Sequence, residues 1–513
     1  MNDMPSGAKN CFSVMKLRLM CAVLSAMTLA VIPASVLAET PPNFVVIFAD
    51  DLGYGDLHCY GSPYSDTPHL DQMAAEGKKF TSFYVAQAVC SASRTALLTG
   101  CYPNRVGIQG ALGPANNHGI NDHEQTIAEV LKLRGYASAI FGKWHLGLTA
   151  GNITDWSKPI TPGPRQVGFD HYYGLVANLP AAPHGFIEDD EISDPFPSVP
   201  PASVATEPAK GRTAWKVDHV MDTLTSKLTG WIEANHTQPF FVYFAPNAVH
   251  EPVAPNARYT GSPYGKYGDF INELDGSVGQ ILATLDRLKL ADNTIVIFTS
   301  DNGGVIEAHN ENSLVAIKAG LAINGPWRGG KHSEWEGGFR EPFIVRWPGQ
   351  VPAGTVSDQV ICLTDLLATF AHVLHAPLRP GQAEDSFNVL RAFTEGQPGA
   401  PVRGPVILQS ADGTYDLRLG DWKLVERVNA PAFSPNRNKR TIAAAQKKQA
   451  AAFSRDELYN LQKDPFEMHD EWSTQQERAA AMKKILGESR DRGFTRLPAE
   501  ARAEDILPAV TQP

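Results

Sequence analysis

The chain has 513 residues, more than one average hydrophobic core organises, so two domains are expected. Hydrophobic residues make up 43% of it and charged residues 19%, which is typical of a globular protein and excludes a disordered or membrane-embedded one. The net charge of −10 argues against binding to nucleic acid, which requires a basic surface. An anionic substrate would therefore be held by a local cluster of cations rather than by the field of the whole protein.

The first 38 residues have the pattern of a signal peptide. Lys16 and Arg18 precede an apolar run at residues 19–32, and the small residues up to Ala38 offer a cleavage site. No later apolar run is long enough to span a bilayer, so we expect an exported protein, periplasmic or secreted, without a membrane span. Four of the six cysteines follow this segment, too few for a disulfide framework in a chain of this length.

Residues 39–400 are expected to form the larger domain, since short β-rich apolar runs alternate there with helical patterns, the rhythm of a doubly wound α/β sheet. Strands are expected at residues 43–48, 137–141, 240–244, 294–299 and 343–347. Helices are expected at residues 123–134 and 270–288, where apolar residues recur at helical spacing. Residues 152–211 are proline-rich and aperiodic, which indicates a lid or pocket wall.

A smaller C-terminal α+β domain is expected at residues 401–513. Short antiparallel strands are predicted at residues 406–409, 416–419 and 422–425, and a helix near residues 475–486. Residues 437–448 form a basic insertion inside this domain. A solvated loop is its more ordinary interpretation, and contact with a polyanion is the alternative.

Two of the expected strands end in acidic residues. Asp50 and Asp51 follow the first strand, and Asp301 and Asn302 follow the fourth. Open α/β sheets bind ligands at the carboxyl ends of their strands, so these four side chains are expected to meet. Unpaired carboxylates would repel one another, and their oxygens suit Ca²⁺ or Mg²⁺. For Asp50 and Asp51 alone, an exposed turn rich in Asp and Gly is the alternative.

Cys90 lies in the segment VCSASRTALLTG, residues 89–100. A helix that opens after it would place Cys90 near a helix N-terminus, where backbone N–H groups and Arg94 favour an anion. A buried cysteine that packs as a small hydrophobe is the alternative.

Three further polar motifs follow or lie between the expected strands. Lys143 and His145 project on one face of an extended segment, where an ammonium and an imidazole can hold an oxyanion and move a proton. His250 lies in the segment APNAVHEP, and Lys331 lies in WRGGKHSEWEGGFREP. Taken singly, each of these residues is more often a surface or hydrogen-bonded group. Five polar motifs in one order along the chain are hard to assign to chance.

The order and wording of the motifs resemble type I sulfatases, the formylglycine-dependent branch of the alkaline-phosphatase superfamily, and within it the arylsulfatase A and N-acetylgalactosamine-6-sulfatase type. The resemblance runs from about residue 43 to residue 470 and includes the segments 457–461 and 464–465. It implies an α/β, alkaline-phosphatase-like fold: a large mixed sheet flanked by helices, with a smaller C-terminal α+β domain that carries a short antiparallel sheet.

The resemblance also implies a site. A formylglycine-generating maturation enzyme would oxidise Cys90 to Cα-formylglycine, whose hydrated aldehyde is the nucleophile. The implied ligands of one Ca²⁺ (or Mg²⁺) are Asp50, Asp51, modified Cys90, Asp301 and Asn302. The implied catalytic residues are Cys90, Arg94, Lys143, His145, His250 and Lys331. Arg94, Lys143 and His145 would hold and activate the nucleophile, while His250 and Lys331 would grip the sulfate and the leaving oxygen.

One position departs from the family's commonest motif, which has proline two residues after the cysteine where this chain has Ala92. Alanine also occurs there in the family, so this residue leaves open which maturation system recognises the chain.

We therefore expect a sulfuric ester hydrolase whose substrate is a sulfated carbohydrate, with aryl sulfates as surrogates. A phosphoester or phosphonate hydrolase of the same superfamily is the nearest alternative, but such sites commonly carry histidine where this chain has Asn302. A polysaccharide-binding protein with an inactive sulfatase fold is weakened because every expected polar position is filled. Trp156 and His184 are candidate sugar contacts, although His184 fits an ordinary loop histidine better. The sugar and the sulfated position stay open.

Overall fold

The computed structural model of this chain describes residues 41–63, 66–113, 119–148, 158–179, 185–193, 216–307, 310–396, 399–427 and 455–496. The expected signal peptide, the basic insertion at residues 437–448, and the candidate sugar contacts Trp156 and His184 lie outside these ranges. The elements described below belong to one unit, Pro42–Pro513.

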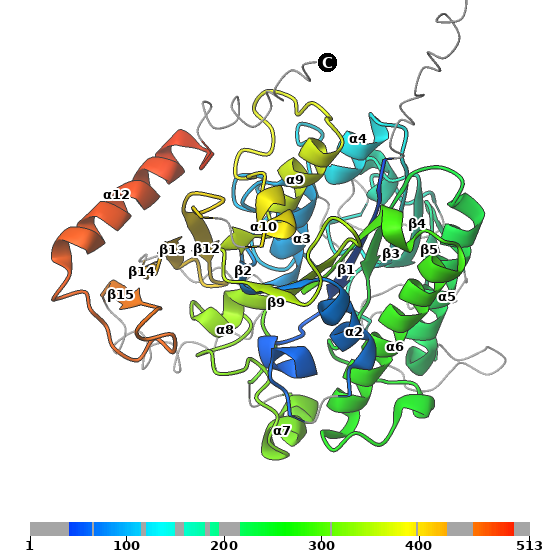
Figure 1. Cartoon of the computed structure of the whole chain (residues 1–513), viewed down its shortest axis with the longest axis horizontal. Helices are drawn as coiled ribbons and strands as arrows, with labels where there is room; N and C mark the ends of the chain where they lie inside the picture. Colours follow the sequence, from blue (N-terminus) through cyan, green and yellow to red (C-terminus); the bar gives the residue numbers. More distant parts are fainter. Residues whose placement is uncertain are drawn as a thin grey trace, which may run out of the picture. The chain divides into compact units, whose positions relative to one another are not determined.

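A mixed sheet of 11 strands carries most of the fold (Figure 1). Its order is β10-β2-β9-β8-β1-β7-β3-β4-β5-β6, with β11 paired to β2. The strands are β1 (Asn43–Ala49), β2 (Lys78–Tyr84), β3 (Ala137–Lys143), β4 (His171–Leu175), β5 (Ile187–Glu188), β6 (Glu191–Ile192), β7 (Phe240–Ala245), β8 (Thr294–Ser300), β9 (Arg340–Arg346), β10 (Thr355–Ser357) and β11 (Ile361–Cys362). β1 runs parallel to β7 and β8, whereas β9 is antiparallel to β8 and β2, so the sheet is mixed.

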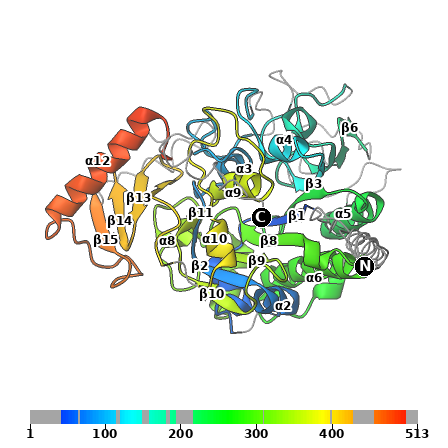
Figure 2. The same cartoon turned by 45° about the horizontal axis from the view of Figure 1, so that its top comes forward.

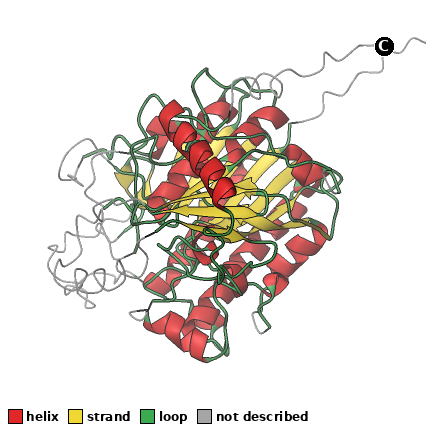
Figure 3. Ribbon diagram, turned by 90° about the vertical axis from the view of Figure 1, so that its left-hand side faces the viewer, coloured by secondary structure: helices red, strands yellow, loops and turns green. Residues whose placement is uncertain are grey.

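Helices cover both faces of this sheet (Figure 3). The helices are α2 (Pro68–Glu76), α3 (Cys90–Thr99), α4 (Ile127–Lys132), α5 (Val220–Asn235), α6 (Gly265–Arg287), α7 (Glu311–Lys318), α8 (Glu336–Phe339), α9 (Asp365–Val373), α10 (Leu390–Thr394) and α12 (Gln476–Arg492). Strand β1 explains the two layers, because its side chains alternate between two hydrophobic clusters. Phe44 and Val46 pack with residues of α3, α4 and α9, while Val45 and Ile47 pack with residues of α5 and α6. A strand buried on both faces reads as the continuous apolar run seen in the sequence.

A separate antiparallel sheet follows, with the order β12-β13-β14-β15 (Figure 2). Its strands are β12 (Val406–Gln409), β13 (Tyr415–Leu419), β14 (Trp422–Glu426) and β15 (Glu457–Asn460). Helix α12 covers this sheet and buries Ala479, Met482 and Leu486 in the cluster that contains Leu417 and Leu424. The large mixed sheet with flanking helices and the short antiparallel sheet confirm the expected fold class.

The expected strands correspond to β1, β3, β7, β8 and β9, but other boundaries differ from the expectation. The helix expected at residues 123–134 begins only at Ile127, because Thr126 and Glu129 form a capping box that starts it there. The segment 152–211 is not all irregular, since β4 extends the large sheet by parallel pairing with β3. Periodicity gave no sign of β4, which is short and contains Gly174.

Candidate active site

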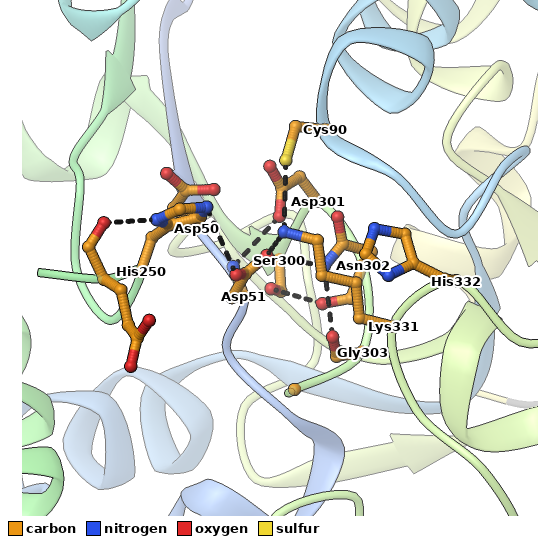
Figure 4. A network of polar contacts seen from close by, with 12 residues as sticks. Asp50, Asp51, Cys90, His250, Ser300, Asp301, Asn302, Gly303, Lys331 and His332 are labelled. Carbon is orange, nitrogen blue, oxygen red and sulfur yellow. Dashed lines mark hydrogen bonds and ion pairs between the residues drawn. The ribbon is translucent and has the colours of Figure 1, made fainter. Parts of the chain in front are cut away.

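Four polar side chains meet where β1 and β8 end (Figure 4). The two strands are parallel neighbours, with Ala49 opposite Ser300, so the residues that follow them share one edge of the sheet. The Asp51 N–H donates to Asp301 Oδ1 at 3.1 Å, and Asn302 Nδ2 donates to Asp51 Oδ1 at 2.8 Å. These residues and Asp50 are all buried. The structure therefore brings the four candidate metal ligands together.

Two buried cations form ion pairs with these carboxylates. Lys143, the last residue of β3, donates to both oxygens of Asp50 at 2.8 Å, and Arg94 of α3 donates from Nη2 to Asp301 Oδ2 at 2.7 Å. Burial opposes ionisation of Asp50, but the surrounding cations, Lys143 first, outweigh it and hold its pKa below the ordinary range. Burial and the neighbouring charge of Asp50 instead raise the pKa of Asp301 to about 6.

A third cation, Lys331, joins Asp51 to Cys90. Its Nζ donates to Asp51 Oδ1 at 2.5 Å and lies 3.4 Å from Cys90 Sγ. Burial opposes the positive charge of Lys331, yet the carboxylates, Asp51 first, raise its pKa above the ordinary value. Three carboxylates and three cations therefore balance one another in this site.

Cys90 is the first residue of α3, with Val89 as the N-cap. Its side chain is buried, and burial raises the pKa of the thiol although Lys143 and Lys331 oppose this. The segment before the helix is fixed, because Ser93 Oγ donates to the Gln87 carbonyl at 2.7 Å. The N-terminus of α3 therefore directs the residue at position 90 toward Lys331, whose charge acts in favour of an anion there although burial opposes it.

His145 is buried in a defined tautomer. Its Nε2 lies 2.7 Å from the carbonyl oxygen of Leu112, and an imidazole can only donate to such a partner. Burial, with help from Lys143 and Arg94, lowers the pKa of His145 well below its ordinary value, so the ring is neutral. Nδ1 therefore carries the lone pair, and it has no hydrogen-bond partner among the described residues.

His250 lies on the side of Asp51 opposite Lys331 (Figure 4). Its Nδ1 donates to the Glu251 carbonyl at 2.6 Å, and its Nε2 is 3.6 Å from Asp51 Oδ2. Burial lowers the pKa of His250, although Asp51 acts in the opposite direction. Nε2 is therefore the nitrogen that can exchange a proton with a bound molecule.

The residues present fit a divalent cation. One oxygen or nitrogen each of Asp50, Asp51 and His250 and the sulfur of Cys90 lie within 4.8 Å of one another, the one such group found in the described ranges. Asn302 Oδ1 is buried and accepts no hydrogen bond from any described residue. An orphaned amide oxygen beside carboxylates is a donor set that suits Ca²⁺ or Mg²⁺.

Asp51, Cys90, His250 and Lys331 open onto a pocket of about 230 Å³. Its other lining residues are Val89, Ala111, Asn178, Glu251, Val305, Glu307, Asn310 and His332. The pocket thus gives a bound molecule access to the sulfur of Cys90 and to the three polar groups around it.

Comparison with known proteins identifies the family. The sulfatase family model matches residues 42–376. An N-acetylgalactosamine-6-O-sulfatase from Bacteroides thetaiotaomicron is 34% identical over 468 residues, which cover 84% of this chain and 89% of that protein. Human arylsulfatase A is 34% identical over 86% of this chain and 85% of its own. The chain belongs to the sulfatase family.

Solved structures agree with this assignment. One solved structure is a sulfatase that Bacteroides thetaiotaomicron uses in the metabolism of multiple glycosaminoglycans. It has a TM-score of 0.77 at 30% identity, over 88% of this chain and 100% of that one. The phosphonate monoester hydrolase of Agrobacterium radiobacter has a TM-score of 0.58 at 15% identity, over 88% and 96%, which shows the fold alone. The chain is thus a sulfuric ester hydrolase, and the phosphonate monoester hydrolase is a distant neighbour.

Sulfatases generally use a divalent cation and a formylglycine residue, so family membership leads us to expect both in this site. No helix in the described ranges combines the length and the apolar character needed to cross a membrane.

The sequence did not single out several residues that the structure of this sulfatase places around the site. Tyr243 of β7 lies with its hydroxyl 3.4 Å from Arg94, inside the sheet. His332 and Glu307 line the pocket, with His332 Nδ1 3.5 Å from the Glu307 carboxylate. His332 could have been found in the sequence, because it directly follows the candidate residue Lys331. Glu307 had none, because it lies beyond β8 in a segment without a recognisable pattern.

Proposed function

We propose that this sulfatase removes sulfate from a sulfated glycan, and that 6-O-sulfated N-acetylgalactosamine is the first substrate to test. Proteins named N-acetylgalactosamine-6-sulfatase recur among the relatives; the human one is 35% identical over 75% of this chain and 73% of its own. The pocket of about 230 Å³ matches a sugar unit in scale better than it matches a long polymer.

The observation that carries the mechanism is the position of Cys90, at a helix N-terminus, 3.4 Å from the ammonium of Lys331 and open to the pocket. Oxidised to formylglycine by a maturation enzyme and then hydrated, this residue would supply a geminal diol. One hydroxyl would attack sulfur and displace the sugar oxygen. The other would lose its proton and re-form the aldehyde, which expels sulfate without an attacking water. Cys90 is thus assigned as the precursor of the nucleophile.

Asp50, Asp51, Asp301 and Asn302 are assigned, with modified Cys90, as ligands of one Ca²⁺ or Mg²⁺. The bound cation supplies positive charge that favours an ionised hydroxyl at position 90 and neutralises the sulfuryl oxygens. Oxygen donors alone, without a histidine in place of Asn302, support the choice of a hard cation over zinc.

Arg94 and Lys143 offset the negative charge of the carboxylates beside the nucleophile, and His145 accepts a proton. Both cations contact the metal-binding carboxylates and are buried, so their charge acts through little screening. His145 is neutral with the lone pair on Nδ1, which is the state a general base requires.

His250 and Lys331 are assigned to the leaving group and the sulfate. Lys331 bridges the metal site and Cys90, so its ammonium can bind the sulfuryl oxygens during transfer. His250 has Nδ1 engaged by a carbonyl, so Nε2, beside the Asp51 carboxylate, is the nitrogen that would first take up a proton and then give it to the departing alkoxide.

Desulfation of a panel of sulfated sugars tests this proposal. The panel contains N-acetylgalactosamine 6-sulfate, its 4-sulfate isomer, N-acetylglucosamine 6-sulfate, an aryl sulfate, and an aryl phosphate for comparison. Release of sulfate from the 6-sulfated galactosamine with no hydrolysis of the phosphate is the expected outcome. Preference for another sugar would contradict the substrate, and preference for the phosphate would contradict the sulfatase mechanism.

We also propose that residues 1–38 are a signal peptide that exports the enzyme, and that residues 39–400 and 401–513 are its catalytic and C-terminal domains. The lysine and arginine before the apolar run support the first assignment. The start of the four-stranded sheet at Val406 supports the second.

A further inference from the structure

The segment that carries Lys331 has no regular structure of its own. It connects the turn at Trp327 to α8, and its backbone lies between Gly304 and Ala88, to which Lys331 and His332 donate hydrogen bonds at 3.2 and 2.9 Å. Lys331 reaches Asp51 and Cys90 through a long, flexible side chain. Whatever fixes the backbone of this segment therefore sets where the ammonium can lie.

One residue of the C-terminal part of the chain, Glu467, holds both ends of this segment. Its backbone carbonyl accepts from Arg328 Nη1 at 2.7 Å, at the beginning. Its carboxylate oxygen Oε2 accepts from the backbone N–H of Glu336 at 2.8 Å, at the end. Lys331 lies three positions after Arg328 and five positions before Glu336, so Glu467 clamps the segment on both sides of the lysine.

Lys423 of β14 completes the clamp. Its Nζ donates to the other Glu467 oxygen at 2.7 Å and to the Glu334 carbonyl at 2.9 Å. Lys423 and Glu467 are both fully buried. An ion pair of this kind contributes little net stability, because the desolvation of its two charges offsets their attraction. The hydrogen bonds of Lys423 instead hold the Glu467 carboxylate and the Glu334 carbonyl in one relative position.

The backbone of Glu467 is also strained. Its φ is 56°, in the left-handed region that a residue with a side chain seldom adopts. Strain of this kind persists only where the surrounding contacts determine the conformation. Here it allows the carbonyl and the carboxylate of one residue to serve opposite ends of the same segment.

We propose that Glu467 is a positioning residue for Lys331, and that it acts with Lys423 to hold the Lys331 segment against Asp51 and residue 90. The four-stranded sheet is thereby part of the catalytic machinery although none of its residues lines the pocket. This inference rests on the proposed role of Lys331 in sulfate transfer.

The test compares Glu467→Gln with Asp365→Asn in the matured enzyme. Asp365 is a matched control, because it is fully buried, pairs with Arg403 at 2.9 Å and accepts from the backbone N–H of Cys362 at 2.7 Å, yet contacts neither Lys331 nor its segment. We expect Glu467→Gln to lower kcat on an aryl sulfate about 10-fold or more with a smaller change in KM, since a misplacement of about 1 Å can cost about 100-fold. Asp365→Asn should lower the melting temperature similarly and leave kcat unchanged. Equal kcat in the two variants would overturn the proposal.

A second readout uses no turnover. In protein made without the maturation enzyme, Lys331 lies beside the Cys90 thiol and favours its reactive thiolate. The rate of Cys90 alkylation by iodoacetamide at one fixed pH, followed on the Cys90 peptide by mass spectrometry, should fall in Lys331→Ala and in Glu467→Gln. Glu467→Gln should have no further effect in the Lys331→Ala background.

A Glu467→Gln effect of the same size in both backgrounds, or none in either, would overturn the positioning role. If wild-type enzyme hydrolyses no sulfate ester, the proposed function fails instead, while the alkylation cycle still decides whether Glu467 positions Lys331.

Discussion

The two histidines of the site are distinguished by their hydrogen bonds to backbone carbonyls. His145 engages Nε2 with Leu112, whereas His250 engages Nδ1 with Glu251. The nitrogen without a carbonyl partner is Nδ1 in the first ring and Nε2, near Asp51, in the second, and burial lowers the pKa of both rings. A single type of side chain is thus prepared for two roles by which of its nitrogens the backbone occupies.

Replacement of Cys90 by alanine should abolish turnover while the fold survives. The lost thiol is small, so the free energy of unfolding should change by about 1–2 kcal/mol. Sulfate release and the melting temperature are the measurements, with the intact mass of the Cys90 peptide in wild-type enzyme reporting conversion of thiol to aldehyde. Substantial activity in the alanine variant would exclude the formylglycine mechanism.

His250→Ala should separate chemistry from binding. If His250 protonates the leaving oxygen, its loss should lower kcat on a glycan sulfate about 10²–10⁴-fold, because an alkoxide leaves poorly without a proton. An activated aryl sulfate, whose phenolate leaves readily, should lose much less. Steady-state kinetics on both substrates give the comparison. Equal losses would mean that His250 mainly binds sulfate, and Lys331 would then be the better candidate acid.

Among the elements, β3 depends on one glycine to deliver Lys143. Gly142 has a φ of 113°, and a Cβ at this position would lie 2.0 Å from the carbonyl oxygen of Ala245 on β7. Only glycine allows the two strands to approach this closely immediately before the lysine that pairs with Asp50.

Gly142→Ala should therefore destabilise the enzyme by about 3 kcal/mol and lower kcat/KM as Lys143 is displaced. Gly135→Ala is the matched control: its φ of 76° is also left-handed, but a Cβ there would meet no atom within 4 Å. That variant should lose about 1 kcal/mol and keep its activity. Thermal unfolding and kinetics of the two variants decide the matter, and equal destabilisation would contradict the steric argument.

At the scale of the whole molecule, three cationic side chains gather in one place although the chain as a whole is negatively charged. The chain carries a net charge of −10, yet Arg94, Lys143 and Lys331 are gathered at one edge of the large sheet. They come from α3, from β3 and from the segment before α8, so only the complete sheet assembles them. Because three carboxylates balance these cations, the divalent cation proposed for the site would supply the net positive charge that attracts an anionic substrate locally.

Metal binding should stabilise the folded protein more at pH 7.5 than at pH 5. The pKa of Asp301 is raised to about 6, above its unfolded value of about 3.9, so metal-free protein loses stability as the pH rises between these values. A bound cation removes that loss, and at pH 5 it must compete with a proton.

The measurement is the rise in melting temperature when Ca²⁺ or Mg²⁺ is added to metal-free protein at each pH. Asp301→Asn should show a smaller rise that hardly depends on pH. A larger rise at pH 5 than at pH 7.5 would contradict the coupling, and stoichiometric zinc in the purified enzyme would contradict the choice of a hard cation.

The sequence by itself determined the central strands and the residues that end them. A strand buried on both faces must be apolar throughout, so β1 and β8 stand out, and the acids that follow them mark the ligand-binding edge. The wording around Cys90 and Lys143 identified the family before any geometry was known. These signals are local, which is why one sequence sufficed.

Tertiary structure alone decided which groups touch. The tautomer of His145 depends on a carbonyl 33 residues away, and the pairing of Lys331 with Asp51 spans 280 residues. Glu467 acts on a segment more than 130 residues earlier through contacts that no local pattern encodes. Such contacts depend on how distant elements pack, so they cannot be predicted from secondary-structure propensity or from the spacing of residues along the chain.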